Sequence, residues 1–221
     1  DVNAEKHEKK DHSAAFLKKQ WVETRMNLGK SIDLYHIHSV TAESKVLEDP
    51  EVLKELEGIK ANGVEIGIST SGPDQKKSIE KLLRINEKIN LFSFVQSTIN
   101  IFEQSCISVL KEASEKKINI IAKEVFSNGQ LTLANKDIHQ KEIRELNILA
   151  NDIHLSLEEL SLLWVYQFSF VKIILTGACT ISQLGENIKS LEKTKAKIPD
   201  LKSFQIDTND YWAMRKLLNW N

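Results

Sequence analysis

The sequence contains little cysteine and has no marked excess of charge of either sign. Its 221 residues include two cysteines, Cys106 and Cys179, which are too few for a disulfide framework, so we expect a protein of a reducing compartment. Thirty basic residues stand against thirty-one acidic ones, and the net charge of −1 argues against a general nucleic-acid or anionic-membrane surface. We therefore expect neither nucleic acid nor a membrane as a partner.

Long hydrophobic runs are also lacking. The most apolar stretch, LSLLWVYQFSFVKIILTGA, is interrupted by Gln167, Ser169 and Lys172, whereas a membrane-spanning helix needs about 20 mostly apolar residues. It is more typical of a buried helix followed by a buried strand. The first ten residues, DVNAEKHEKK, are polar and charged, which does not indicate a signal peptide. These features predict a cytoplasmic protein with a single domain over residues 1–221.

Helix-like and strand-like segments alternate along the chain. Strands are expected to start near residues 32, 64, 92, 118 and 171, mostly about 30 residues apart and with a helix in each interval. This alternation predicts βαβ units with a parallel sheet. The architecture is then either an open doubly wound sheet or a (β/α)8 barrel. Because a barrel needs eight strands, the five strands here predict an open sheet or a TIM barrel without its first three strands.

Helix boundaries carry clear signals. Residues 13–29 have helical spacing of apolar residues, begin at Ser13 and end at Gly29. A second helix within residues 49–63 has Asp49 as its expected N-cap, followed by a proline in the first turn. Trp164 and Trp212 lie in helix-like segments and are expected to be packing residues.

The predicted strand IDLYHIHS, residues 32–39, carries two histidines. Side chains alternate along a strand, so Leu34, His36 and His38 share one face. His38 lies at the carboxyl end, where parallel α/β folds bind their ligands. It is either a functional residue or a half-buried histidine that hydrogen-bonds a neighbouring carbonyl, and its position supports both equally. His36 lies one step deeper and is expected to be a packed interior residue.

Polar residues follow the next two predicted strands. Ser69, Thr70 and Ser71 could hold a ligand amide or phosphate, although Ser71 is more simply the cap of the following helix. Gln96 lies in an otherwise apolar strand, where a buried amide needs a partner in the protein or in a ligand.

The last two strands also end in polar residues. Lys123 and Glu124 end the fourth strand, where a solvated ion pair is the simpler interpretation, and the Asn-Gly pair that follows predicts a turn. After the fifth strand, Thr180 and Gln183 have the spacing of a capping box that opens a helix. A helix N-terminus suits a phosphate, but every helix has one.

Taken in order, these segments resemble the aldo-keto reductase family. IDLYHIHS is similar to its Asp-Leu-x-x-x-His strand, GVEIGIST to its Gly-x-Ser-Asn strand, and FVQSTINIFEQS to its Gln-x-x-x-Asn segment. LTGACTISQLGEN resembles its closing element, which ends in Glu-Asn, and KEVFSNGQLT and DYWAMRKLLNW resemble one bacterial branch. The resemblance runs from about residue 11 to the end.

The resemblance implies a (β/α)8 barrel that binds NADP(H) or NAD(H) across its carboxyl-end mouth. Such an enzyme moves a hydride between nicotinamide C4 and the carbonyl carbon of a small aldehyde or ketone. His38 would be the histidine that orients the carbonyl, because a neutral imidazole N–H can hydrogen-bond the oxygen as negative charge develops there.

The resemblance also implies a path for the cofactor along the chain. Ser69, Thr70 and Gln96 would face the nicotinamide carboxamide, and the stem of Lys123 would partly cover the nicotinamide ring in place of the family's usual aromatic residue. The segment from Glu124 through Asn128 to Gly129 would follow the pyrophosphate. The adenosine end would be held by Gly177, Ala178, Thr180, Gln183, Glu186 and Asn187. Ala178 and Gln183 supply no cation for a 2′-phosphate, so NAD(H) is plausible beside NADP(H). No metal site is predicted.

The family's aspartate, tyrosine and lysine belong to its first strands, which correspond to positions ahead of Asp1. The leading hypothesis is an NAD(P)-dependent aldo-keto reductase, although residues 1–221 do not include these three groups. The alternative is a non-catalytic NAD(P)-binding regulatory subunit on the same fold. An open doubly wound domain of unknown function is a third hypothesis.

Overall fold

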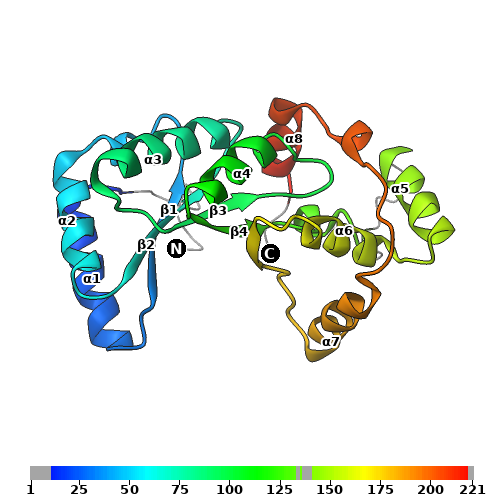
Figure 1. Ribbon diagram of the computed structural model, residues 1–221, viewed down its shortest axis with the longest axis horizontal. Coiled ribbons are helices and arrows are strands. Elements are labelled where there is room, and N and C mark those ends of the chain that lie inside the picture. The colour runs from blue at the N-terminus through cyan, green and yellow to red at the C-terminus, as the bar shows by residue number, and fades with distance from the viewer. Residues whose placement is uncertain (1–10, 133–134, 136–140, 219–221) are drawn as a thin grey trace.

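A computed structural model describes residues 11–132, 135 and 141–218. The helices are α1 (Ala14–Leu28), α2 (Pro50–Lys60), α3 (Gln75–Ile89), α4 (Ile107–Glu115), α5 (Lys141–Asp152), α6 (Leu157–Tyr166), α7 (Ile181–Ser190) and α8 (Thr208–Lys216) (Figure 1). The strands are β1 (Leu34–Val40), β2 (Glu65–Thr70), β3 (Phe94–Thr98), β4 (Asn119–Lys123) and β5 (Val171–Ile174).

The strands form one parallel sheet in the order β1-β2-β3-β4-β5. Each strand is therefore paired with the next one in the sequence, and the described strands contain no point at which this order reverses. A doubly wound sheet requires such a reversal, so that alternative is wrong. The order is that of consecutive strands in the wall of a (β/α)8 barrel.

The expected caps explain where several helices begin. Ser13 accepts a hydrogen bond from Phe16 N at the start of α1, and α1 ends at Gly29, whose φ of 58° lies in the left-handed half of φ/ψ space. Asp49 caps α2, as predicted. The cap predicted for α3 is wrong, because α3 begins after Asp74, and Ser71 N instead donates to Val40 O at 3.0 Å, which holds the turn against β1.

The sheet has an outer face that is packed under the helices. Ile37, Ile68, Val95 and Ile120 lie side by side in the register of β1–β4, and none is more than 4% exposed. They belong to the hydrophobic core, together with apolar residues of α2, α3, α4 and α6. Burial of these side chains is the main favourable term that holds the helices on the sheet.

The opposite, inner face carries His36 beside Gly67. A Cβ atom at Gly67 would lie 2.4 Å from His36 Cδ2 and Nε2 and 2.9 Å from Phe94 O. Only glycine leaves room for the imidazole ring, and His36 is therefore an interior residue, as expected. Its Nε2 is buried without a hydrogen-bond partner among the described residues, and burial lowers the pKa of the ring to about 4, so the ring is neutral.

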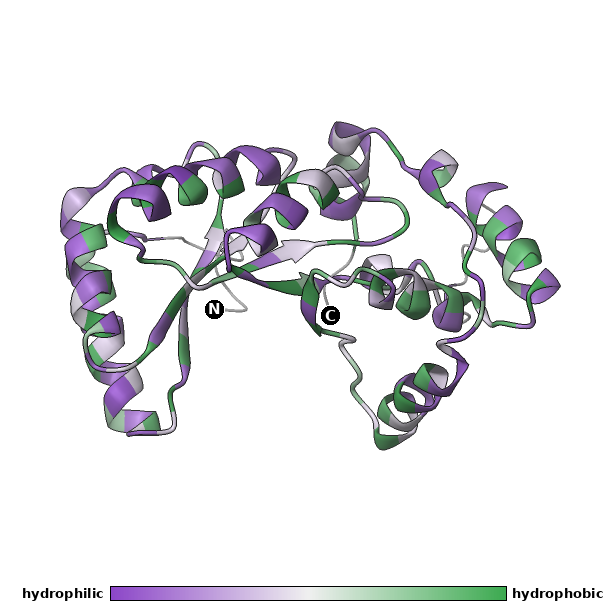
Figure 2. Ribbon diagram, in the orientation of Figure 1, coloured by the Kyte–Doolittle hydropathy of each residue, from purple (hydrophilic) through white to green (hydrophobic). Residues whose placement is uncertain are grey.

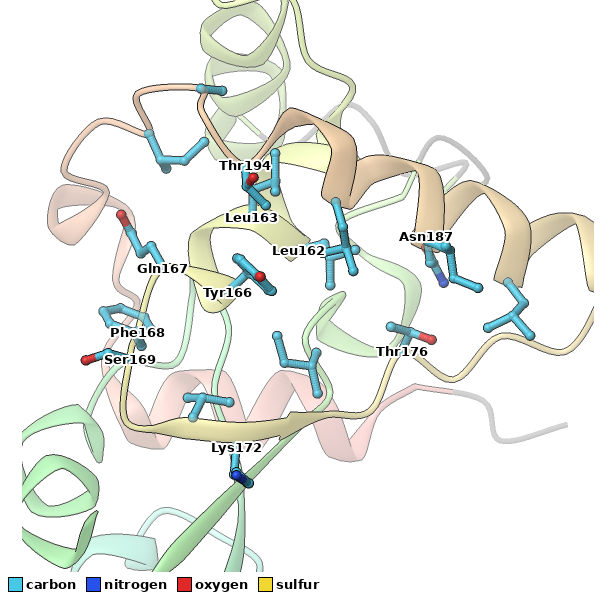
Figure 3. Close-up of a pocket in the computed structure, with 17 residues that line it drawn as sticks. Leu162, Leu163, Tyr166, Gln167, Phe168, Ser169, Lys172, Thr176, Asn187 and Thr194 are labelled. Atoms are coloured by element: carbon cyan, nitrogen blue, oxygen red, sulfur yellow. The ribbon is translucent and has the colours of Figure 1, made fainter. Parts of the chain in front are cut away.

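The segment from β5 through α7 is much less buried. Along residues 171–200, Ser190 is the one buried residue, and Ile181 and Ile188 of α7 are 92% and 60% exposed. Figure 2 shows hydrophobic residues on α7, which lies apart from the sheet after an extended segment. The side chains of α6, β5 and α7 line a pocket of about 740 Å³ that lies between these elements (Figure 3).

Two further observations complete the fold. Trp164 and Trp212 are 3% and 2% exposed, so both are packing residues, as predicted. Within the described ranges, no helix has both the length and the apolar character needed to span a membrane.

Candidate active site

Three of the predicted site residues lie towards the carboxyl ends of the neighbouring strands β1, β2 and β3. Ser69 and Gln96 are register partners on neighbouring strands. Ser39 N donates to Ser69 Oγ at 3.0 Å, which joins the end of β1, with His38, to the end of β2. The structure therefore places His38, Ser69 and Gln96 on consecutive strands, as the family resemblance implies.

His38 is exposed at an irregularity of β1. The register with β2 shifts between Ile37 and Val40, and Ser39 has a φ of 52°. His38 Nε2 lies 3.2 Å from Ser39 Oγ, and its own carbonyl oxygen lies 2.9 Å from His12 Nε2. His12 Nδ1 lies 3.0 Å from Ser44 Oγ, so the His12 ring bridges the end of β1 to the following loop. No local pattern around His12 indicates this role.

Thr70 faces the helix side of the sheet. Its hydroxyl is fully buried and donates to Gln75 Oε1 at 2.9 Å. The same oxygen of Gln75 accepts from Ser97 Oγ and from Thr98 N, both at 2.9 Å. The side-chain amide of Gln75, the first residue of α3, thus holds the ends of β2 and β3 together. Thr70 supports the site from the helix side of the sheet.

Glu124 lies directly after β4 and pairs with α8. Arg215 Nε donates to both Glu124 carboxylate oxygens at 3.0 Å, and Arg215 Nη2 donates to Oε1. Burial alone would raise the pKa of this carboxyl, but the hydrogen bonds and the charge of Arg215 outweigh it and hold the pKa below its usual range. The predicted solvated pair with Lys123 is corrected: Glu124 forms a largely buried ion pair with Arg215, and the charge of Lys123 also lowers the pKa of the carboxyl.

The loop after β4 is a tight turn, as the Asn-Gly pair predicts. Glu124, Ser127, Asn128 and Gly129 have φ values of 56°, 49°, 55° and 90°. Such values are uncommon for residues other than glycine. Asn128 Nδ2 donates to Glu124 Oε2 at 3.2 Å, which closes the loop on itself.

Asn100 joins this loop to Tyr211 of α8 through hydrogen bonds. Asn100 Nδ2 donates to Glu124 O and to Tyr211 Oη, both at 2.9 Å, and Asn100 Oδ1 accepts from Phe102 N and Glu103 N. Tyr211 is 2% exposed, and burial raises the pKa of its hydroxyl. A buried hydroxyl that is bound in this way is a structural group and a poor proton donor.

The residues predicted for the adenosine end lie together around the start of α7. Gly177 has a φ of 66°, and the Thr180–Gln183 capping box is present. Gln183 Oε1 accepts from Cys179 N at 2.8 Å and from Thr180 N at 3.2 Å. Asn187 lines the pocket between α6, β5 and α7 (Figure 3).

The predicted site residues thus fall into two groups. The first lies in or directly after β1–β4 and comprises His38, Ser69, Thr70, Gln96, Lys123, Glu124, Asn128 and Gly129. The second comprises Gly177, Ala178, Thr180, Gln183, Glu186 and Asn187, which follow β5. Both groups lie towards or beyond the carboxyl ends of parallel strands, where α/β proteins bind their ligands.

A parallel sheet in this strand order, with polar residues at the strand ends, defines an α/β protein of the barrel type. The aldo/keto reductase family model matches residues 2–206, which is most of the chain. The chain therefore belongs to the aldo/keto reductase family, a class of oxidoreductase enzymes.

Individual relatives agree with this assignment. The chain is 27% identical over 212 residues to "Uncharacterized oxidoreductase YqkF" of Bacillus subtilis, a match that covers 90% of this chain and 67% of that protein. It is 25% identical over 183 residues to "Uncharacterized oxidoreductase C215.11c" of Schizosaccharomyces pombe, a match that covers 79% of this chain and 52% of that protein. The chain thus spans between half and two thirds of the length of these relatives.

Solved structures show the same fold. The holo form of aldo-keto reductase AKR11C1 from Bacillus halodurans superposes with a TM-score of 0.65 at 18% identity, covering 93% of this chain and 68% of that one. The apo form of the same protein gives a TM-score of 0.66.

Proposed function

We propose that this chain forms the cofactor-binding part of an NAD(P)(H)-dependent aldo-keto reductase that acts on a small aldehyde or ketone. The observation that carries the proposal is the position of His38, Ser69 and Gln96 on consecutive strand ends. In this proposal the bound nicotinamide supplies or accepts the hydride. The residues of the chain bind the cofactor and orient the carbonyl group.

The strand ends fit a nicotinamide carboxamide chemically. Gln96 is half-buried and presents an amide, which can both donate and accept. The Ser69 hydroxyl accepts from Ser39 N and keeps its own proton as a donor. Gln75 and Thr70 then act as positioning residues, because they hold the two strand ends at a fixed spacing.

In this proposal His38 orients the carbonyl oxygen of the substrate. Its ring is exposed at the strand end, and its backbone is held by His12. A neutral imidazole that donates a hydrogen bond would stabilise negative charge as it develops on the substrate oxygen. Tyr211 does not supply the proton in this proposal, because its hydroxyl is buried against Asn100.

The start of α7 suits the adenosine end of NAD(H) better than that of NADP(H). A 2′-phosphate is best held by a guanidinium or an ammonium group, and the first turn of α7 offers instead the Thr180–Gln183 capping box. The preference between the two cofactors therefore tests the assignment of this second group of residues.

The test is a titration of the chain with NADH and with NADPH, followed by the fluorescence of its four tryptophans. We expect NADH to bind at least as tightly as NADPH. Gln96→Leu should weaken binding by about tenfold, because it removes the side-chain amide that would hydrogen-bond the carboxamide and leaves only the Ser69 hydroxyl. Gln20→Leu, at an exposed site in α1, is the matched control and should bind as the wild type does.

The absence of binding by a chain with a folded circular dichroism spectrum would overturn the proposal for this chain. The alternative, a nucleotide-binding subunit without catalysis, predicts the same binding. It differs from the leading proposal in predicting that the protein binds NADH but reduces no aldehyde.

A further inference from the structure

The ion pair between Glu124 and Arg215 joins two segments that are 91 residues apart in the sequence. The two side chains are 11% and 21% exposed, so the pair is largely removed from water. The guanidinium of Arg215 also lies 5.0 Å from the ring centroid of Trp212. Helix α8 is thus fixed to the loop after β4 by a charged contact, beside the buried contact of Tyr211 with Asn100.

Both carboxylate oxygens of Glu124 are engaged within the protein. Oε1 accepts from Arg215, and Oε2 accepts from Arg215 and from Asn128 Nδ2. A carboxylate that is bound in this way has little capacity left for a ligand. The role of Glu124 is therefore to hold Asn128 and Arg215 rather than to touch the cofactor.

The charge of Glu124 would otherwise oppose the binding of an anion at this loop. A dinucleotide carries a negatively charged pyrophosphate, and like charges repel strongly where water is partly excluded. The guanidinium of Arg215 neutralises the carboxylate. It also holds in place a loop whose backbone has left-handed φ values at Glu124, Ser127 and Asn128.

We propose that Arg215 is a positioning residue for the dinucleotide: through Glu124 it orders the loop 124–129 and cancels the negative charge beside the pyrophosphate. This inference rests on the proposed function. Helix α8 is then part of the cofactor site, although it acts on the cofactor only indirectly, through Glu124 and the loop 124–129.

The test compares three variants of the chain with a control. Arg215→Met removes the guanidinium, Glu124→Gln removes the carboxylate charge, and the double variant removes both. Lys116→Met is the control, because Lys116 forms an exposed ion pair with Glu87 on the surface of the protein. For each protein we would measure the dissociation constants of NADH and of adenosine, the thermal midpoint, and the hydrogen exchange of residues 124–130.

Arg215→Met should weaken NADH binding by about tenfold, because it leaves an unpaired charge beside the pyrophosphate. Adenosine has no pyrophosphate, so its affinity should be unchanged. The double variant should recover most of the lost NADH affinity, which a purely structural role of Arg215 would not allow. Arg215→Gln, which keeps a donor to Glu124, replaces the methionine variant in every comparison if that variant does not fold.

The outcomes separate this inference from the proposed function. If the wild type binds neither NADH nor NADPH, the proposed function fails. If the wild type binds and Arg215→Met binds equally well, the positioning role is overturned while the proposed function stands. The charge-cancelling part of the inference is overturned if the double variant binds as weakly as Arg215→Met, and the whole inference is overturned if Lys116→Met weakens binding to the same extent.

Discussion

The β1–β4 region and the β5–α7 region are built from the same kind of βα unit but are packed very differently. In the first region, the outward-facing strand residues, such as Ile68, and the helix residues that cover them, such as Leu82, are almost fully buried. In the second, α7 has an equally clear amphipathic pattern, yet Leu184 is 50% and Ile188 60% exposed.

This difference separates local from tertiary causes of structure. The capping box of α7 is as complete as that of α6, so local hydrogen bonds suffice to place a helix start. They do not place the helix against the sheet. That requires a neighbouring apolar surface, and on α7 the apolar residues line an open pocket beside α6 and β5.

The largest expected effect comes from truncating one leucine in each region. Leu82→Ala in α3, where the side chain is 0% exposed, should lower the free energy of unfolding by about 2–5 kcal/mol, because it leaves a cavity. Leu184→Ala in α7 should cost less than about 1 kcal/mol. Urea unfolding of the two variants measures both values. Equal losses would contradict the comparison, because they would mean that α7 is covered in solution.

A smaller effect is expected from acid, which should act on the packed region through His36. The folded-state pKa of about 4 lies below the ordinary value of 6.5, so the unfolded chain binds the proton more tightly. The stability that His36 contributes is thus fully present above pH 6.5 and is lost as the pH falls towards 4. The loss should be about 1–3 kcal/mol.

His36→Phe, which keeps a ring beside Gly67 without a titrating group, should remove this part of the pH dependence. His154→Asn is the control, because His154 is exposed and Asn suits its φ of 59°. Urea unfolding at pH 7 and pH 5 measures the difference. A pH dependence that persists in His36→Phe would assign the effect to other groups.

The smallest effect is expected at the two capping boxes. Ser156→Ala at the start of α6 should lower the global free energy of unfolding by about 1 kcal/mol, because α6 unfolds with the core. Thr180→Ala should leave the global value within about 0.5 kcal/mol and instead speed hydrogen exchange in α7. If Thr180→Ala destabilised the whole chain as much as Ser156→Ala does, α7 would belong to the same cooperative unit.

The sequence predicts those features that depend on neighbouring residues. It predicts the strands, the caps Ser13 and Asp49, the Thr180–Gln183 box and the turn at Asn128–Gly129, because each follows from contacts within a few residues. Local patterns do not determine the strand order, and the observed order β1-β2-β3-β4-β5 decides between the two expected architectures.

The supports of the site could not be predicted in this way. Arg215 and Glu124 are 91 residues apart, and Asn100 and Tyr211 are 111 apart, so no local pattern joins them. Gln75 stands in a charged helix start and has no signal that distinguishes it from a surface residue. Ser71 is an error of the opposite kind. The local pattern predicts that it caps a helix, but in the fold Ser71 N donates a hydrogen bond to Val40 O.

The single oxygen of Gln75 has a consequence for how the strand ends move. Because Thr70, Ser97 and the backbone at Thr98 all donate to it, neither strand end can shift without breaking a bond that the other shares. Thermal motion of the two ends should therefore be correlated, with the first turn of α3 as their common anchor. The ends of β2 and β3 should therefore respond as one unit, and not as two independent strands, to a molecule that is bound at Ser69 and Gln96.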